Sequence, residues 1–232
     1  MIRSPVFGCL QNPSMVDFPG RMAAVFFVSG CNFHCGFCHN ASLMGTPRPG
    51  MNWDELSQRC QRFSQNWIQA AVITGGEPTL SPTLPELIRF FRKLGWAVKL
   101  DTNGSNPDLL AQCLPDLDYV AMDVKTSLAE YPSLAGWTDT EAICRSLHLL
   151  REQARAYEFR STLIEGVHHA DILAAMLPLV EGAVRYVLQP FVPADTLPGK
   201  AFRTIPRTSA GFMENAGVIF HDHVQELIVR GA

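Results

Sequence analysis

The sequence has few charged residues and no basic patch. Charged residues make up 18% of the 232 positions, and the formal net charge is −3. A typical soluble domain has about a quarter of its residues charged. Proteins that bind a nucleic-acid backbone need clustered lysine and arginine to neutralise phosphates. The sequence therefore predicts that nucleic acid is not a partner.

Long apolar runs are also missing. No apolar stretch reaches the length of about 20 residues that a membrane-spanning helix needs. The first 14 residues lack the apolar core of a secretory signal peptide. We therefore expect no membrane partner. With 47% hydrophobic residues and no linker-like change in composition, the chain is expected to form one domain over residues 1–232.

The cysteines do not form the pattern of a secreted disulfide framework. Their number, seven, is odd, and four of them are scattered among apolar or helical stretches: Cys9, Cys60, Cys113 and Cys144. Small secreted domains have even numbers of regularly spaced cysteines instead. We interpret the scattered four as small buried hydrophobic residues, and we expect a reducing, cytoplasmic location.

The other three cysteines, Cys31, Cys35 and Cys38, lie in a CxxxCxxC spacing. They follow the apolar run 23–28, which is typical of a buried strand, so they lie on a loop at the strand's C-terminal end. Thiolates are preferred ligands of soft metals and iron–sulfur clusters. Three thiolates can hold three irons of a [4Fe–4S] cube and leave the fourth iron open to bind a substrate.

Two other interpretations of these cysteines stay open at this point. A structural zinc site usually has four ligands, and here His34 or His39 would have to supply the fourth. A loop of thiols that bind no metal is also possible.

Strands and helices alternate along the rest of the chain. The strands are expected at 6–10, 22–28, 70–73, 96–100, 119–122, 158–164 and 185–188, the first two joined by a turn at Pro19-Gly20. The helices are expected at 52–66, 81–94, 107–113, 140–156, 170–179 and 209–216, followed by an apolar segment at 218–220. This order predicts an α/β fold with a parallel sheet, a partial, open (β/α)6 barrel resembling a TIM barrel. Its active site would lie at the C-terminal ends of the strands.

Polar and glycine residues follow five of these strands: 75–77, 101–104, 123–125, 165–166 and 189–191. Asp123 and Lys125 are two residues apart and therefore share a face, where Lys125 could pair with a substrate carboxylate. A buried Asp–Lys salt bridge is the alternative. Three further side chains could hold an adenine or a carboxylate, or only fill core and turns: Arg160, Thr162 and Gln189.

Several motifs together resemble the radical S-adenosylmethionine (radical SAM) superfamily. They are DFPGR at 17–21, the cysteine stretch through His39-Asn40, TGGEP at 74–78, DTNG at 101–104 and DxK at 123–125. Within the superfamily, they resemble the glycyl-radical-enzyme activating enzymes, and most closely the short activating proteins of anaerobic ribonucleoside-triphosphate reductase. The likeness covers most of the chain to about residue 125, and it continues more loosely to residue 191.

This resemblance implies a reaction. A [4Fe–4S] cluster on Cys31, Cys35 and Cys38 would bind S-adenosylmethionine (SAM) and cleave it to methionine and a 5′-deoxyadenosyl radical. The radical would abstract a Cα hydrogen from one glycine of a partner, a glycyl radical enzyme such as anaerobic ribonucleotide reductase. Flavodoxin or ferredoxin would be the electron donor.

The resemblance also implies binding roles. The GGE motif would hold the SAM amino group, and Phe37 would contact the adenine. A monovalent cation would lie beside the SAM carboxylate, surrounded by Asp101, Thr102 and Asp123. The expected cofactor-binding residues are Phe37, Gly75, Gly76, Glu77, Asp101, Thr102, Asp123, Lys125 and Gln189.

The chain departs from the family pattern in three places. His34 stands where a basic residue is frequent, Gly36 replaces proline or a larger residue, and the segment after Pro193 matches no known pattern. Two other functions stay open. One is a radical SAM enzyme acting on a small molecule, such as 7-carboxy-7-deazaguanine synthase, which shares the length, CxxxCxxC and GGEP. The other is a non-catalytic zinc-binding module.

Overall fold

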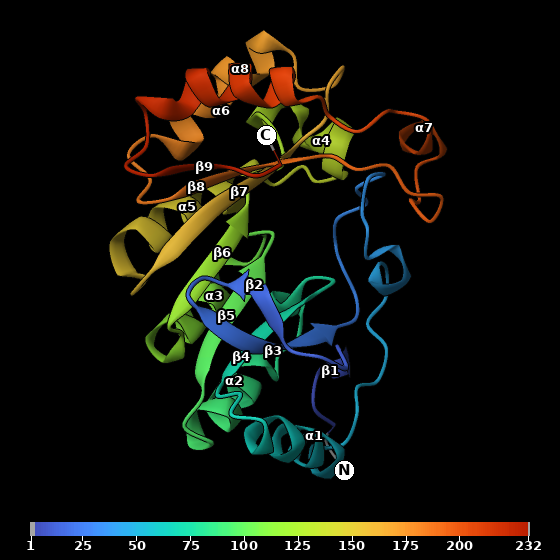
Figure 1. Ribbon diagram of the computed structural model, residues 1–232, viewed down its shortest axis with the longest axis vertical. Coiled ribbons are helices and arrows are strands. Elements are labelled where there is room, and N and C mark those ends of the chain that lie inside the picture. Colours follow the sequence, from blue (N-terminus) through green and yellow to red (C-terminus); the bar gives the residue numbers. More distant parts are fainter. Residues whose placement is uncertain (1–2, 232) are drawn as a thin grey trace.

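A twisted sheet runs through the protein in the computed structural model, which describes residues 3–231 (Figure 1). Its strand order is β1-β3-β4-β5-β6-β7-β8-β9, and β2 also pairs with β3. From β3 to β9 all neighbouring strands are parallel, whereas β1 and β2 run antiparallel to β3. The strands are β1 Val6–Cys9, β2 Ser14–Phe18, β3 Arg21–Val28, β4 Ala70–Gly75, β5 Ala97–Thr102, β6 Tyr119–Asp123, β7 Tyr157–Leu163, β8 Tyr186–Pro190 and β9 Leu227–Val229.

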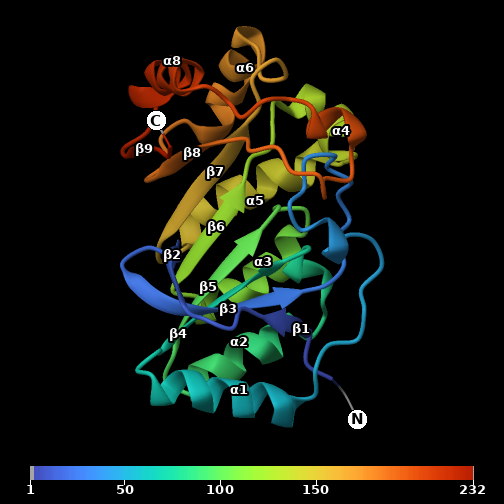
Figure 2. The same ribbon diagram turned by 45° about the vertical axis from the view of Figure 1, so that its right-hand side comes forward.

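Helices follow the parallel strands and cover one face of the sheet (Figures 1 and 2). The α-helices are α1 Trp53–Gln65, α2 Leu84–Lys93, α3 Pro107–Cys113, α4 Tyr131–Ala135, α5 Thr140–Gln153, α6 Ala170–Val180, α7 Lys200–Arg203 and α8 Ala210–His221. Short 3-10 helices lie at η1 Ala41–Leu43, η2 Pro78–Leu80, η3 Leu114–Asp116 and η4 Leu128–Glu130. Within residues 3–231, no helix combines the length and apolarity that crossing a membrane would require.

The sheet curves but does not close. Strands β1 and β9 form the ends of the strand order, and no pairing joins them in the described chain. The prediction of an α/β, partial and open barrel is therefore confirmed. The barrel has one more parallel strand than expected, because β9 was not predicted. This strand has only three residues, too few to show a clear apolar period.

Other differences from the predicted elements are local. The segment before Pro19-Gly20 is strand β2, so the turn closes a hairpin rather than a loose link. Helix α2 begins at Leu84 instead of Ser81, because the Ser81 hydroxyl bonds the Thr83 hydroxyl at 3.0 Å rather than capping a helix. The apolar segment 218–220 is the last turn of α8 and not a separate element.

The two faces of the sheet have different side chains. The face toward the helices contributes Phe26, Ile73, Leu100, Met122 and Phe159 to one large apolar core. The opposite, concave face has only a small apolar cluster at its base, formed by Phe18, Ala23, Val25, Ala70, Val72 and Tyr119. Charged and polar side chains occupy the concave face nearer the C-terminal ends of the strands. This polar edge is where the cysteine loop lies.

Candidate active site

The cysteine loop, residues 30–40, follows β3 and is held by backbone hydrogen bonds to distant segments. They run from Glu77 N to Gly30 O (2.7 Å), from His34 N to Ala135 O (2.7 Å) and from Gly199 N to Gly36 O (2.9 Å). These contacts join the loop to the end of β4, to α4 and to the segment before α7. The loop position is therefore fixed by the whole fold and not by its own sequence.

All three clustered thiols line a pocket of about 230 Å³ at this edge of the sheet. Burial raises the pKa of Cys31 to about 12 and also raises the pKa values of Cys35 and Cys38. The thiols therefore stay protonated until a metal displaces their protons. Soft thiolates in such numbers are the donor set of an iron–sulfur cluster.

The arrangement does not suit a single metal ion. Among residues 3–231, no group of three or more His, Cys, Asp or Glu side chains is close enough to share one ion. A tetrahedral zinc site needs four ligands around one ion. Thiols that lie farther apart can each bind a different iron of a cluster, so the residues present fit a [4Fe–4S] cluster better than zinc.

The two glycines of the GGE motif bring β4 close to β3. A Cβ at Gly75 would lie 2.4 Å from Val28 O, and one at Gly76 would lie 2.0 Å from Gly30 O. Gly75 also has φ +121°, a conformation that side chains rarely adopt. Both glycines line the pocket. Their first physical requirement is thus the close approach of β4 to the strand and loop that carry the cysteines.

Glu77 lies differently from the expected cofactor-binding position. Its side chain is fully buried, and it is not among the residues that line the pocket. Its carboxylate accepts hydrogen bonds from Thr79 N (3.0 Å) and Thr79 Oγ1 (2.6 Å). It also accepts from Thr102 Oγ1 (2.7 Å) and Asn103 N (2.6 Å). Burial outweighs these bonds and raises the pKa of Glu77. In this structure the side chain joins the ends of β4 and β5.

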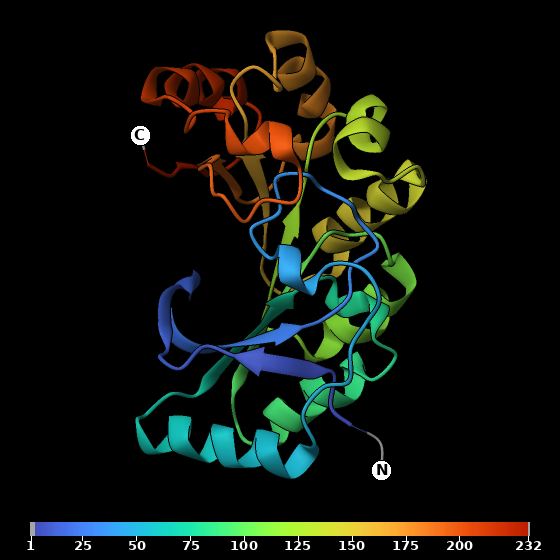
Figure 3. The ribbon, with the colours of Figure 1, turned by 90° about the vertical axis from the view of Figure 1, so that its right-hand side faces the viewer.

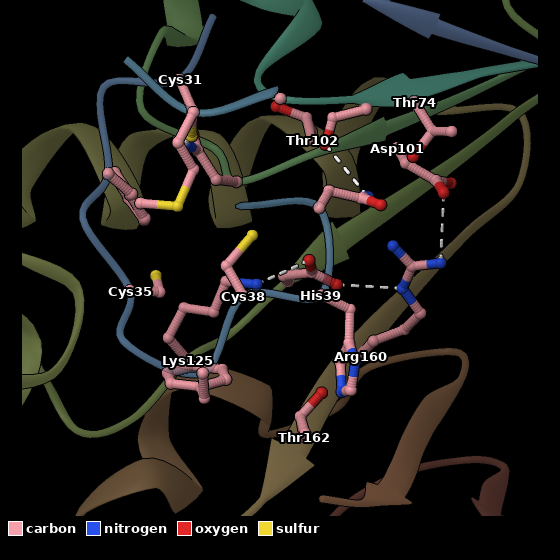
Figure 4. A pocket seen from close by; sticks show the side chains of 18 of the residues that line it. Cys31, Cys35, Cys38, His39, Thr74, Asp101, Thr102, Lys125, Arg160 and Thr162 are labelled. Atoms are coloured by element: carbon pink, nitrogen blue, oxygen red, sulfur yellow. Dashed lines mark hydrogen bonds and ion pairs between the residues drawn. The ribbon is translucent and has the colours of Figure 1, made fainter. Parts of the chain in front are cut away.

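A chain of charged side chains crosses the pocket floor (Figure 4). Arg160 lies between two carboxylates, with Nε 3.0 Å from Asp123 Oδ1 and Nη1 3.4 Å from Asp101 Oδ2. Lys125 Nζ is 2.8 Å from Asp123 Oδ2, and the buried Lys99 pairs with Asp101 Oδ1. The Asp123–Lys125 salt bridge, one of the two alternatives for this pair, is present, and both side chains line the pocket. Pairing of Lys125 with a substrate carboxylate stays a prediction.

The pKa values in this chain follow from the ion pairs. Burial opposes the ionised form of Asp101, but Arg160 and Lys99 outweigh it and lower the pKa. For Asp123, burial is likewise outweighed by Lys125 and Arg160, so its pKa is lowered. Burial would lower the pKa of Lys125, but Asp123 raises it. Asp101 and Asp123 are therefore ionised and Lys125 is protonated at neutral pH.

The expected residues meet in one place, with one exception. Apart from Glu77, all of them line this pocket: Cys31, Cys35, Phe37, Cys38, Gly75, Gly76, Asp101, Thr102, Asp123, Lys125 and Gln189. Arg160 and Thr162, which the sequence marked only as open candidates, line it too. Asn103 also lines the pocket and was not among the expected site residues, although it belongs to the DTNG motif that follows β5. Its Nδ2 donates to Asn32 Oδ1 of the cysteine loop at 3.0 Å.

Side chains behind the pocket hold its walls. Gln189 Nε2 donates to Thr162 Oγ1 at 2.8 Å across β8 and β7. The buried His168 accepts from Ile164 N through Nδ1 at 2.9 Å, which leaves Nε2 to donate to Lys125 O at 3.0 Å. Burial lowers the pKa of His168, so the ring is neutral and this pair of bonds is retained at neutral pH.

The segment 192–207, which includes α7, covers the outer side of the cysteine loop (Figure 3). The ring of Phe202 lies 5.8 Å from that of Phe37, between centroids. A Cβ at Gly36 would come within 2.6 Å of the Phe202 ring. Glycine at position 36, a departure from the family pattern, therefore lets the Phe202 ring lie directly against the cysteine loop.

Fold and site together define the class: an open α/β barrel with a three-thiol pocket at the C-terminal edge of its strands. The family model described as the radical SAM superfamily matches residues 25–177. The chain belongs to the radical SAM superfamily, whose members use a [4Fe–4S] cluster and SAM, and the protein is a radical SAM enzyme.

Two relatives match nearly the whole chain. A Methanocaldococcus jannaschii protein with the provisional name glycyl-radical enzyme activating enzyme is 28% identical over 225 residues, 94% of this chain and 92% of its own. A 7-carboxy-7-deazaguanine synthase of Thermococcus kodakarensis is 23% identical over 229 residues, 88% of each chain. The solved domain of a pyruvate-formate lyase-activating enzyme from Bacteroides vulgatus is 14% identical, with a TM-score of 0.56, over 69% of this chain and 98% of that one. That structural likeness shows the fold alone.

Proposed function

We propose that this protein is a glycyl-radical-enzyme activating enzyme whose partner is anaerobic ribonucleoside-triphosphate reductase. The observation that carries the proposal is the pocket itself, which joins three thiols to a charged floor at one edge of the sheet. The full-length likeness to the Methanocaldococcus jannaschii protein supports the activating class. The choice of the reductase as partner rests on the sequence resemblance through His39-Asn40 and residues 17–21.

When bound, a [4Fe–4S] cluster on Cys31, Cys35 and Cys38 supplies the electron that cleaves SAM to methionine and a 5′-deoxyadenosyl radical. The protein's own contribution is binding and exclusion of solvent. Lys125, whose ammonium group lines the pocket, attracts the SAM carboxylate. Phe37 is buried in the pocket wall, where its ring offers an apolar surface to the adenine. Burial of the site keeps water and other C–H bonds away from the radical.

The first experiment tests the cluster. The protein is reconstituted with iron and sulfide without oxygen, reduced with dithionite, and measured by EPR with and without SAM. We expect a [4Fe–4S]⁺ signal that changes when SAM is added. Cys38→Ala should lose this signal, and the matched control Cys144→Ser, at an exposed cysteine that does not line the pocket, should keep it. A cluster signal indifferent to SAM in the unaltered protein would contradict the proposal.

The second experiment tests the partner. The reduced protein is mixed with SAM and the purified anaerobic reductase, and the glycyl radical is measured as an EPR doublet alongside released 5′-deoxyadenosine. We expect both products only when the reductase is present. A reductase variant with its radical glycine replaced by alanine is the control and should give no doublet.

The likeness to 7-carboxy-7-deazaguanine synthase favours one second candidate, a radical SAM enzyme for a small molecule. It predicts sustained 5′-deoxyadenosine release with the substrate of that synthase and no protein partner. Robust turnover under those conditions, together with no glycyl radical on the reductase, would replace the activating function. Absence of turnover would leave the activating function as the better explanation.

A further inference from the structure

Arg160 occupies the place that the family resemblance assigns to a monovalent cation. That resemblance puts a cation among Asp101, Thr102 and Asp123, beside the SAM carboxylate. In the structure, the guanidinium of Arg160 lies between the two carboxylates, 3.0 Å from Asp123 and 3.4 Å from Asp101. Figure 4 shows Arg160 beside Asp101, joined to it by a dashed line.

Each carboxylate oxygen of Asp101 and Asp123 already has a cationic side chain as its partner. Asp101 Oδ1 faces Lys99, and Asp101 Oδ2 faces Arg160. Asp123 Oδ1 faces Arg160, and Asp123 Oδ2 faces Lys125. Each of the four oxygens is thus paired with a positively charged donor, as charge-assisted hydrogen bonds require.

Thr102 is no better placed to bind an ion. Its hydroxyl donates to Glu77 Oε1 at 2.7 Å and accepts from Gly104 N at 3.1 Å. The proton and one lone pair of this hydroxyl are thus used by two buried groups, which leaves an ion only the second lone pair of the oxygen. Among residues 3–231, no group of three acidic, histidine or cysteine side chains converges on one ion here.

The surrounding side chains supply no unpaired carboxylate for a metal cation. Lys99, Arg160 and Lys125 lie beside Asp101 and Asp123, and the buried Glu158 on the same face of β7 also acts on Arg160 and raises its pKa. The side chain of Arg160 is only 14% exposed, so solvent screens its charge poorly. A metal cation would therefore have to compete with the guanidinium for the same two carboxylates.

The position of Arg160 follows from the sheet. Asp123 and Arg160 are register partners on the neighbouring parallel strands β6 and β7. Asp101 lies one strand further along, on β5, in register with Ala121 of β6. Since the three side chains share the concave face, the guanidinium spans both carboxylates. Arginine is permanently charged and planar, so it keeps this bridge at any physiological pH.

We propose that the Arg160 guanidinium is a built-in cation that takes the place of the monovalent metal ion between Asp101 and Asp123. The proposal rests on the proposed function for the identity of the ligand, SAM. Its consequence is that SAM binding by this protein needs neither sodium nor potassium. Arg160 is here a positioning residue, because it holds the two carboxylates and the charge of the pocket floor.

The first test uses the unaltered, cluster-loaded protein. SAM affinity is measured by equilibrium dialysis in sodium chloride, in potassium chloride and in tetramethylammonium chloride at equal ionic strength. We expect the three dissociation constants to agree within about twofold, since a saturated site gains nothing from the metal. The proposal would be overturned if the dissociation constant for SAM were about tenfold or more higher in tetramethylammonium chloride and if this difference saturated with added sodium or potassium.

The second test uses the metal-free apoprotein and needs no activity. Sodium binding is measured by ²³Na NMR line broadening, and the thermal midpoint is measured in the same three salts. The unaltered protein should show no saturable sodium binding. Arg160→Met should bind sodium or potassium and gain thermal stability from it, because the two carboxylates then lack their shared cation. Saturable sodium binding by the unaltered protein, lost on Asp123→Asn, would contradict the proposal.

Two further variants complete the test. Arg160→Lys keeps the charge and should restore cation independence even where SAM affinity falls. Arg145→Met removes an exposed ion pair with Asp108 and should leave the cation response unchanged. If Arg160→Met does not fold, the comparison of salts on the unaltered protein still decides the question. Failure of the proposed function would appear separately, as absence of SAM binding in every salt.

Discussion

The two faces of the sheet differ although the same strands form both. Toward the helices, neighbouring strands align Phe26, Ile73 and Leu100 in one apolar row. One residue along, on the concave face, the same strands align Val25, Val72 and the buried Lys99. Because side chains alternate along a strand, each strand can supply packing on one face and charge on the other. We therefore expect substitutions on the two faces to change different properties.

The largest expected effect is on the packed face. Phe26→Ala removes a fully buried ring that lies 4.7 Å from Phe91 between centroids. We expect the free energy of unfolding to fall by about 3–5 kcal/mol, the range for a large aromatic replaced in a core. Urea unfolding measures it, and the control Met15→Ala, at a side chain 76% exposed, should change it by less than about 0.5 kcal/mol. A loss under about 1 kcal/mol for Phe26→Ala would show that the helix-facing core is not the main source of stability.

An intermediate effect is expected at the buried Glu77, which lies between the C-terminal end of β4 and η2. Glu77→Gln keeps the shape but replaces one accepting oxygen with a donor, so at least one of four buried donors loses its partner. We expect a loss of about 2–3 kcal/mol in unfolding free energy. The exposed Glu214→Gln is the matched control. If the variant kept full stability but bound SAM much more weakly, the expected role of Glu77 in cofactor binding would be favoured over its bracing role.

The smallest effect is a pH dependence behind the concave face. The buried His168 has a lowered pKa, whereas the unfolded chain titrates near the ordinary value of about 6.5. Below that value the unfolded state binds more protons, so unfolding free energy should fall as pH falls, by at most about 1.4 kcal/mol per unit. His168→Gln should reduce this slope between pH 7 and pH 5, and His148→Gln, at an exposed histidine, should not. Equal slopes in all three proteins would contradict the prediction.

Much of the fold could be predicted from local sequence signals. Apolar runs such as 70–73 are bounded by turn residues, and Asn52 forms the capping box that begins α1. The predicted strand ends also showed that the cysteine loop and the motifs at 74–78, 101–104 and 123–125 follow strands. Because the strands are parallel, these segments lie at the same edge of the sheet. Every expected site residue but Glu77 therefore lines one pocket, and their binding roles stay predictions. The assignment of residues 1–232 to one domain and the identity of the partners stay predictions.

The rest depends on contacts between distant segments. The bridge from Arg160 to Asp123 follows from the register of β6 and β7, and no short motif encodes it. The direction of the Glu77 side chain depends on Thr102 and Asn103 of another strand, so the GGE motif alone could not give it. The three residues of β9 form a strand because the edge of β8 is available to them.

The packing of Gly36 against Phe202 has a consequence for how such proteins can be recombined. The cysteine loop and the segment 192–207 pack together at a glycine, and a larger residue at position 36 would have to displace the Phe202 ring. A chimera that takes its last forty or so residues from a relative with proline or a larger residue at position 36 would place two mismatched surfaces together. The two segments must therefore be exchanged as a unit, although most of the chain separates them.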